Sequence, residues 1–552
     1  MSQKKTIAAI KRHRTARMAK LMTRSYSLYR RGKKDELSTL IADEMLAMGG
    51  IYVKFLQGVM LQSAIMKRWH NPDKLKIFEK LDTEPLDIVN ILQANLGSKV
   101  SDIEEIQPVP FAAGTFGQVY YGKHVDGTPI IVKVLRPLIA ETLKFDLKLL
   151  KRFWNVTSKR YSPNLSVDFT AAFDDFAAQT MNETDYAEEA RFAAEQYEAY
   201  KDHPKLVIPR TYTDLCTPQI IVQEYVGGIS ASHLVEMKQQ GVDPEEYVKE
   251  HLGSDLVEQL STLGYELIWG VFSLPRIMGD PHPGNVKLLE DNRVALLDFG
   301  ISARPGDNQA AFLGMIREYD AITHGRFNIV NLFSATMRFF GRDLYLALSK
   351  VSKLADKDID LNLELSKVIK KNFEILSGGE DLETIIQSPK AITLVNKVAN
   401  QNNRFALKMK VESTEMIRAI QSGVSLVDSL GLYPKVMPRV YQSVLKQIEQ
   451  EQPELTGSNE PDMSVSHAID ILYGWMERVA ARDPALFQSL MAKLQLKRAA
   501  NKAKDPSSQP DKPEGKDSEQ TGIEIDKEET SKGSDKLKQE VKDEIADLLR
   551  KS

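Results

Sequence analysis

The sequence predicts an α+β fold in two lobes, with a helical extension before it and a helical region after it. Residues 108–136 alternate between strand-like runs, a loop of small residues and a tight turn. Residues 285–297 contain two short apolar runs that read as a strand hairpin. Residues 37–66 and 301–498 instead repeat apolar residues at helical spacing.

The composition is that of an ordinary globular protein. At 552 residues, 42% of them apolar, the chain is long enough for two or three domains with ample core. The most apolar stretch, Leu256–Pro275, contains Glu258 and Glu266, so no transmembrane helix is expected. Cys216 is the only cysteine, which excludes an internal disulfide and favours a reducing, cytoplasmic compartment.

Residues 1–34 form a basic arm. They contain twelve Lys and Arg and no acidic residue, although the whole chain has a net charge of −3. Such an arm is attracted to anionic lipid, nucleic acid or an import receptor. We expect no nucleic-acid partner; peripheral attachment to an anionic membrane, organelle targeting and a solvated or loosely helical tail all stay open.

A helical extension is predicted over residues 35–107. Apolar residues recur at helical spacing from Leu37 to Met66, and Gly49-Gly50 can interrupt the helix. Lys54 and Gln57 lie three residues apart and therefore on one helical face. Both are expected to face a bound nucleotide.

The first lobe, predicted over residues 108–226, begins with a loop typical of nucleotide binding. Small residues are needed there because backbone amides must approach the phosphates closely. Gly114, Gly117 and Val119 match the pattern G-x-G-x-x-G-x-V, and Ala112 stands at its first glycine. The residues expected to cover the nucleotide are Ala112, Ala113, Gly114, Thr115, Phe116, Gly117, Gln118 and Val119.

A lysine and two carboxylates follow this loop. Lys133 lies near the end of the strand-like run Ile130–Val134, in the place of the lysine that pairs with phosphates in kinases. Such a lysine needs a carboxylate to fix its position. Glu183 and Glu189, in a helix predicted over 167–200, are both candidates.

The first lobe is expected to end at a hinge. The strand-like run Ile220–Val226 leads into Gly227-Gly228, which suits a connection between lobes. Glu224 and Val226 are expected to contact the nucleotide there.

The second lobe, predicted over residues 227–400, carries the chemistry. Asp280, an Asn five residues later (Asn285) and Asp298 at the start of D-F-G are typical of kinase-fold phosphotransferases. Mg²⁺ prefers oxygen ligands, which Asn285 and Asp298 can supply. Asp280 can then orient, or take a proton from, the group that attacks the γ-phosphate of ATP. Protein kinases and small-molecule kinases share this half-site, so the phosphoryl acceptor stays open.

Two further segments complete the chain. Residues 401–500 are predicted to be a C-terminal helical region. Residues 501–552 are predicted to be a disordered tail, because most of this stretch is rich in charged residues, Ser and Pro and lacks aromatic residues.

With these motifs, residues 40–305 resemble the UbiB family of atypical kinase-like proteins, also called AarF-domain kinases. D-P-H-P-G-N at Asp280–Asn285, Lys133 and the E-x-D-Y-x-x-E pattern at Glu183–Glu189 carry the resemblance. Family members have a K-x-G-Q motif on a helix that covers the active site, which here reads Lys54-Phe55-Leu56-Gln57. Two further departures are Gly114 in a loop that the family keeps alanine-rich and Met278 where the family has His.

The resemblance implies a two-lobed protein-kinase-like fold that uses ATP and Mg²⁺. It also implies that Lys54 pairs with Glu183, that Lys133 pairs with Glu189, and that the Lys54 helix lies where a peptide substrate would dock. The implied function is ATP hydrolysis or phosphorylation of a small molecule in support of isoprenoid-quinone (ubiquinone) or lipid metabolism. Anionic membrane lipid or an isoprenoid lipid would then be a partner.

Two other functions stay open at this point. One is a small-molecule kinase of the aminoglycoside or choline type, and the other is a nucleotide-binding scaffold with little turnover. The oligomeric state is not indicated by the sequence.

Overall fold

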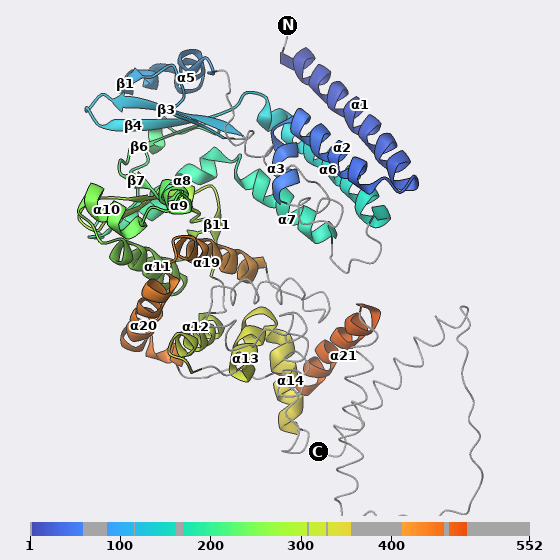
Figure 1. The fold of residues 1–552 in the computed structure, drawn as a ribbon, viewed down its shortest axis with the longest axis vertical. Coiled ribbons are helices and arrows are strands. Elements are labelled where there is room, and N and C mark those ends of the chain that lie inside the picture. Colours follow the sequence, from blue (N-terminus) through green and yellow to red (C-terminus); the bar gives the residue numbers. More distant parts are fainter. Residues whose placement is uncertain are drawn as a thin grey trace, which may run out of the picture. The chain divides into compact units, whose positions relative to one another are not determined.

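The computed structural model describes residues 3–58, 85–114, 116–161, 169–305, 309–326, 329–354, 411–456 and 463–482. The chain divides into two compact units (Figure 1). The first unit comprises Met1–Pro305 and Glu415–Val444, and the second comprises Gly306–Thr414 and Leu445–Ser552. Thr115 and the predicted tail 501–552 lie outside the described residues.

Helices open the first unit. They are α1 (Gln3–Arg30), α2 (Lys34–Met48) and α3 (Ile51–Gly58), which share a core with α6 (Ile139–Tyr161) and α7 (Phe169–Asn182). Gly49 and Gly50 separate α2 from α3, as the sequence predicts, and both have positive φ, which glycine adopts most readily. The basic arm 1–34 is mostly the helix α1, whose Met18 and Leu21 are buried in that core. One face of the arm is therefore packed against protein and not solvated.

An antiparallel sheet follows. Its strands, in the order β1-β3-β4-β6, are β1 (Ile103–Ile106), β3 (Gly117–His124), β4 (Pro129–Leu135) and β6 (Ile220–Glu224), and β2 (Ala112–Ala113) pairs with β3. Side chains alternate between the two faces of a strand. Ile130, Val132 and Val134 accordingly share one face of β4, where they are fully buried and form a core with α5 (Ile88–Leu96).

The single helix predicted over residues 167–200 is wrong, because α7 ends at Asn182 and α8 (Tyr186–Tyr200) begins four residues later. Asp185 starts the new helix: its side chain accepts a hydrogen bond from the amide of Glu188, a standard N-cap. The break places Glu183 between two helices and Glu189 inside the second one. The two carboxylates can therefore reach different partners.

The second half of this unit contains helices and short strands. The helices are α9 (Ala231–Gln239), α10 (Pro244–Leu252) and α11 (Leu256–Ser273). A four-stranded sheet has the order β5 (Leu206–Val207), β10 (Val294–Leu296), β9 (Val286–Leu288), β7 (Ile229–Ser230), so the predicted hairpin is present as β9 and β10. Among the described helices, α11 included, none is long and apolar enough to cross a membrane.

Two helices from far along the chain complete the first unit. α19 (Val411–Ser429) and α20 (Tyr433–Glu451, of which the part up to Val444 belongs here) pack on α11 at glycines. A Cβ atom at Gly423 of α19 would lie 2.7 Å from Cδ1 of Leu267, and one at Gly264 of α11 would lie 3.1 Å from Cγ2 of Val440. These close approaches define where α19 and α20 lie on α11.

The described residues of the second unit are helical. Its elements are α12 (Gln309–Thr323), α13 (Ile329–Phe340), α14 (Arg342–Leu354), the 3₁₀ turn η6 (Pro453–Thr456) and α21 (Val465–Arg482). α13 contacts both α12 and α14, and α14 also contacts α21. Of these elements, η6 and α21 lie in the predicted C-terminal helical region 401–500, whereas α12, α13 and α14 lie in the range predicted as the second lobe, 227–400. Residues 401–410, 457–462 and 483–500 of the C-terminal region lie outside the described residues.

Candidate active site

A two-stranded pairing brings the two aspartate loops together. β8 (Ile277–Met278) ends just before Asp280, and its antiparallel partner β11 (Ser302–Ala303) follows Asp298. Between them, the amide of Gly279 donates to the carbonyl of Ile301 at 2.8 Å. A Cβ atom at Gly279 would lie only 3.0 Å from that same carbonyl oxygen, so the residue before Asp280 has to be small for the loops to meet.

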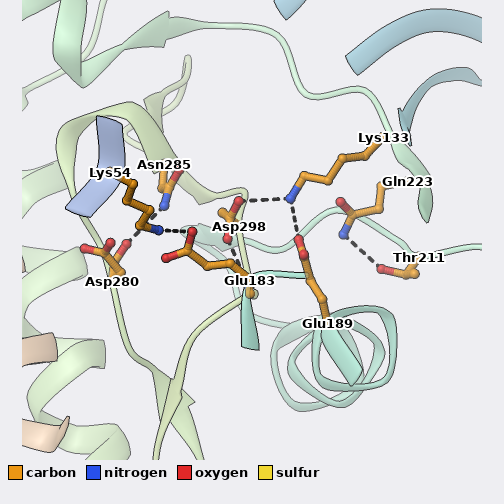
Figure 2. Close-up of polar contacts among 10 residues, drawn as sticks. Lys54, Lys133, Glu183, Glu189, Thr211, Gln223, Asp280, Asn285 and Asp298 are labelled. Atoms are coloured by element: carbon orange, nitrogen blue, oxygen red, sulfur yellow. Dashed lines mark hydrogen bonds and ion pairs between the residues drawn. The ribbon is translucent and has the colours of Figure 1, made fainter. Parts of the chain in front are cut away.

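Asn285 links the two loops. Its side-chain Nδ2 donates to the backbone carbonyl of Asp280 at 3.1 Å, and its own backbone carbonyl accepts from the amide of Leu297 at 3.0 Å (Figure 2). This hydrogen bond fixes the side chain of Asn285 through Nδ2, and its Oδ1 takes no part in the bond. Asp280, Asn285 and Asp298 are therefore held in one fixed arrangement.

Lys133 reaches across from the sheet to two carboxylates. Its Nζ lies 2.9 Å from Oδ2 of Asp298 and forms an ion pair with Oε1 of Glu189 (Figure 2). Glu189 comes from α8 and is only 4% exposed, whereas the side chain of Asp298 is 37% exposed. The pairing of Lys133 with Glu189 is the one that the family resemblance implies.

Burial and mutual charge set the pKa values in this cluster. Burial opposes the ammonium form of Lys133, but Asp298 and Glu189 hold its pKa well above the usual value. Burial raises the pKa of Glu189 to about 7, although Lys133 opposes that shift. For Asp298 the effect of burial is outweighed by Lys133 and by a hydrogen bond from the amide of Gly300, so its pKa is lowered. The cluster therefore favours the charged form of Lys133 and the charged form of Asp298.

A second ion pair connects α3 to the break before α8. Lys54 contacts Oε2 of Glu183, as the resemblance implies (Figure 2). The Nζ of Lys54 also lies 5.4 Å from the ring centre of Phe116. The two charged side chains are 22% and 23% exposed. Gln57 lies in the last turn of α3, but its side chain is not among those described.

The predicted nucleotide loop forms a narrow turn. Ala112 pairs with Val119 and Ala113 with Gln118, and the amide of Gly114 donates to the carbonyl of Gly117 at 2.9 Å. The guanidinium of Arg136 donates to the carbonyl of Gly114 at 3.2 Å, which ties the turn to the end of β4.

Gln118 differs from the prediction that it covers the nucleotide. Its side chain is fully buried, and its Oε1 accepts hydrogen bonds from the amide of Leu86 and the hydroxyl of Tyr120. An amide group in a core needs such partners. The side chain therefore supports the fold, and only its backbone belongs to the loop.

A lysine that no motif marks contacts the hinge from another part of the chain. Lys287, on β9, donates to the carbonyl of Val226 at 2.7 Å, and burial lowers its pKa. The backbone amide of Glu224 donates to the carbonyl of Arg210 at 2.9 Å, which ties the end of β6 to the segment that precedes this strand. The local sequence around Lys287 gave no sign of this contact, because the two segments are far apart in the chain.

A serine from α19 also reaches the site. The hydroxyl of Ser422 donates to Oδ1 of Asp280 at 3.0 Å, across 142 positions of sequence. No motif marks Ser422, so sequence reasoning had no means of finding it.

Comparison with known proteins identifies the domain. Residues 79–316 match the model of the ABC1 atypical kinase-like domain, and this stretch contains Lys133, Glu189 and both aspartate loops. This stretch of the chain is therefore similar to an ABC1 atypical kinase-like domain. The resemblance to the UbiB family and the kinase-like α+β fold predicted from the motifs are thereby confirmed.

Three curated relatives show the extent of the likeness. The Arabidopsis thaliana protein ACTIVITY OF BC1 COMPLEX KINASE 1, chloroplastic, is 30% identical over 38% of this chain and 30% of its own length. ACTIVITY OF BC1 COMPLEX KINASE 3, chloroplastic, of the same plant is 25% identical over 50% and 38%. An uncharacterised protein in the hydrogenase 1 5′ region of Clostridium pasteurianum is 28% identical over 63% and 61%. The chain thus matches less than two thirds of the length of each of these relatives.

A solved structure, the complex of Rv3197 with erythromycin from Mycobacterium tuberculosis, is also similar. It is 22% identical and has a TM-score of 0.43, with 75% of this chain and 98% of that chain covered.

Proposed function

We propose that the ABC1 domain binds ATP together with Mg²⁺ and either hydrolyses the γ-phosphate or transfers it to an acceptor. The observation that carries this proposal is the convergence of Lys133, Asp280, Asn285 and Asp298 from separate elements onto one place (Figure 2). Phosphoryl transfer requires mainly positioning and neutralisation of negative charge. Lys133, with its raised pKa, supplies a cation for the phosphates, and Glu189 keeps that cation in position.

The donor set fits Mg²⁺. In the described part of the chain no group of three or more His, Cys, Asp or Glu side chains is arranged to hold a metal. Mg²⁺ does not need such a cage, because it keeps waters and phosphate oxygens and takes one or two protein oxygens. Oδ1 of Asn285 and the partly exposed carboxylate of Asp298 are those oxygens in this proposal. When bound, the ion would neutralise charge on the phosphates.

Asp280 is proposed to hold the attacking group. Its Oδ1 already accepts a hydrogen bond from a hydroxyl, that of Ser422, so the carboxylate is directed toward a position where a hydroxyl can be oriented or deprotonated. Lys54 and Glu183 lie on the same side of the site (Figure 2) and would restrict entry of an extended peptide. This arrangement favours a small molecule, water or an internal residue as the acceptor.

A role at an isoprenoid-quinone or lipid membrane is the finer part of the proposal. It is supported by α1, on which several basic side chains are exposed. The exposed basic residues of α1 are Lys5, Arg12, Lys20, Arg24 and Arg30. Each Lys or Arg near an anionic surface contributes about 1 kcal/mol to attraction at low salt.

A small-molecule kinase of the aminoglycoside or choline type would use the same aspartates. The presence of α3, which brings Lys54 to Glu183 ahead of the nucleotide loop, favours the ABC1 type of reaction instead.

The assignment of Asp298 is tested by nucleotide binding. In Asp298→Asn the Mg-dependent rise in melting temperature on adding ATP should be lost, because one anionic ligand is removed from a partly exposed site while the core is untouched. Asp291→Asn is the matched control, since Asp291 is an exposed residue of the turn between β9 and β10. If ATP stabilises Asp298→Asn as much as the control, the metal assignment is wrong.

A further inference from the structure

α19 carries Ser422 into the position that a phosphoryl acceptor would occupy. The hydroxyl of Ser422 donates to Oδ1 of Asp280 at 3.0 Å, and a hydroxyl hydrogen-bonded to this carboxylate is what general-base assistance requires. Asp280 is the residue to which the proposed function gives that task. Among the described residues, Ser422 is the one whose hydroxyl donates to this carboxylate.

The orientation of this hydroxyl is unusual for a serine in a helix. Helical Ser and Thr commonly donate to the carbonyl four residues earlier, and Ser261 and Thr262 in α11 do so, at 2.6 and 3.1 Å. Ser422 donates away from its own helix, to the aspartate loop. Its hydroxyl is therefore available to the site and is not used to satisfy its own backbone.

The helix that holds Ser422 is firmly placed. Gly423 allows α19 to approach α11 and the aspartate loop, since a Cβ atom there would lie 2.7 Å from Leu267 and 3.6 Å from Pro281. Met416 and Leu426 of the same helix are fully buried. α19 is thus part of the core of the first unit, and this packing holds Ser422 beside Asp280.

We propose that Ser422 is the residue on which this chain phosphorylates itself in cis. The inference rests on the proposed use of ATP. The Ser422 oxygen forms a bond to the γ-phosphorus, the bond from that phosphorus to the β,γ-bridging oxygen breaks, ADP leaves, and the hydroxyl proton passes to Asp280. In the proposed function Lys54 and Glu183 restrict entry of an extended peptide, so an acceptor already supplied by the chain has an advantage over one from solution.

The test uses the full-length purified chain with Mg-ATP and maps phosphate by mass spectrometry. Wild type should carry phosphate on Ser422, and Ser422→Ala should fall to the level of Asp280→Asn. Ser422→Thr retains a hydroxyl and should carry phosphothreonine at that position. Ser425→Ala is the matched control, because Ser425 is exposed on the same helix and should leave incorporation at the wild-type level.

Cis transfer is tested separately. The phosphorylated fraction at a given time should not change on dilution, and Asp280→Asn chains mixed with wild type should stay unmodified. Phosphate appearing on Ser422 of the Asp280→Asn chains would overturn the cis geometry.

Two negative results are distinguishable. If wild type is stabilised by Mg-ATP and consumes it but Ser422 stays unmodified, this inference fails and the proposed function stands. If Mg-ATP neither stabilises wild type nor is consumed by it, both fail.

Discussion

The position of α3 depends on its aromatic contacts more than on its ion pair. Phe55 is fully buried, and its ring lies edge-on to Trp154, Phe173 and Phe176 at centre distances of 5.4, 5.7 and 5.2 Å. Truncating such a residue to alanine costs about 3–5 kcal/mol. The Lys54–Glu183 pair, partly exposed at both ends, is worth about 1 kcal/mol or less.

Hydrogen–deuterium exchange of the α3 amides measures this difference. Since about 1.4 kcal/mol corresponds to a tenfold change in an equilibrium, Phe55→Ala should accelerate exchange in α3 by about a hundredfold or more. Lys54→Met should accelerate it by about fivefold at most, because a partly exposed ion pair contributes little. Phe111→Ala is the control for loss of a ring, since Phe111 is 58% exposed. If Lys54→Met releases α3 as fully as Phe55→Ala does, the ion pair and not the rings holds the helix.

Three further predictions follow from the structure. Gly114→Ala should fold normally, because nothing lies within 4 Å of the added Cβ atom, yet incorporate less phosphate than wild type; equal or greater incorporation would show that the loop does not limit the reaction. Burial raises the pKa of Glu266 from 4.5 to about 7, so the folded state holds a proton that the unfolded state releases between these values. Stability should therefore fall as pH rises from 4.5 to 7, by about 3 kcal/mol at most, and urea unfolding of Glu266→Gln should lack this part of the dependence. Replacing Arg12, Lys20 and Arg24 together with Gln should weaken sedimentation with anionic liposomes by about a hundredfold at low salt, an effect that added salt removes; unchanged sedimentation would exclude α1 as the attachment surface.

The parts of the site that could be predicted from the sequence are those formed by residues close to one another in the chain. The spacing of Asp280, Asn285 and Asp298 is a property of one loop and one hairpin, so it could be read directly. The break before α8 was missed although the sequence contained its signal, an Asp followed three residues later by a Glu, which is typical of a helix N-terminus.

Contacts between distant segments could not be predicted in the same way. Tyr52 of α3 donates to Oδ1 of Asp146 on α6 at 2.8 Å, and Arg14 of α1 pairs with the other oxygen of that carboxylate. None of these three residues stands in a motif. Burial raises the pKa of both Tyr52 and Asp146. Their partnership follows only from the way three helices pack. The same is true of Ser422 and Asp280.

The path of the chain gives the α19 contact a thermodynamic consequence. The chain leaves the first unit at Pro305, soon after D-F-G, and returns at Glu415, shortly before Ser422. Docking of α19 therefore closes a loop that consists of residues 306–414, and for a flexible chain of that length closure costs about 4 kcal/mol in entropy. The packing of α19 on α11 and the hydrogen bond from Ser422 to Asp280 have to offset this entropy cost.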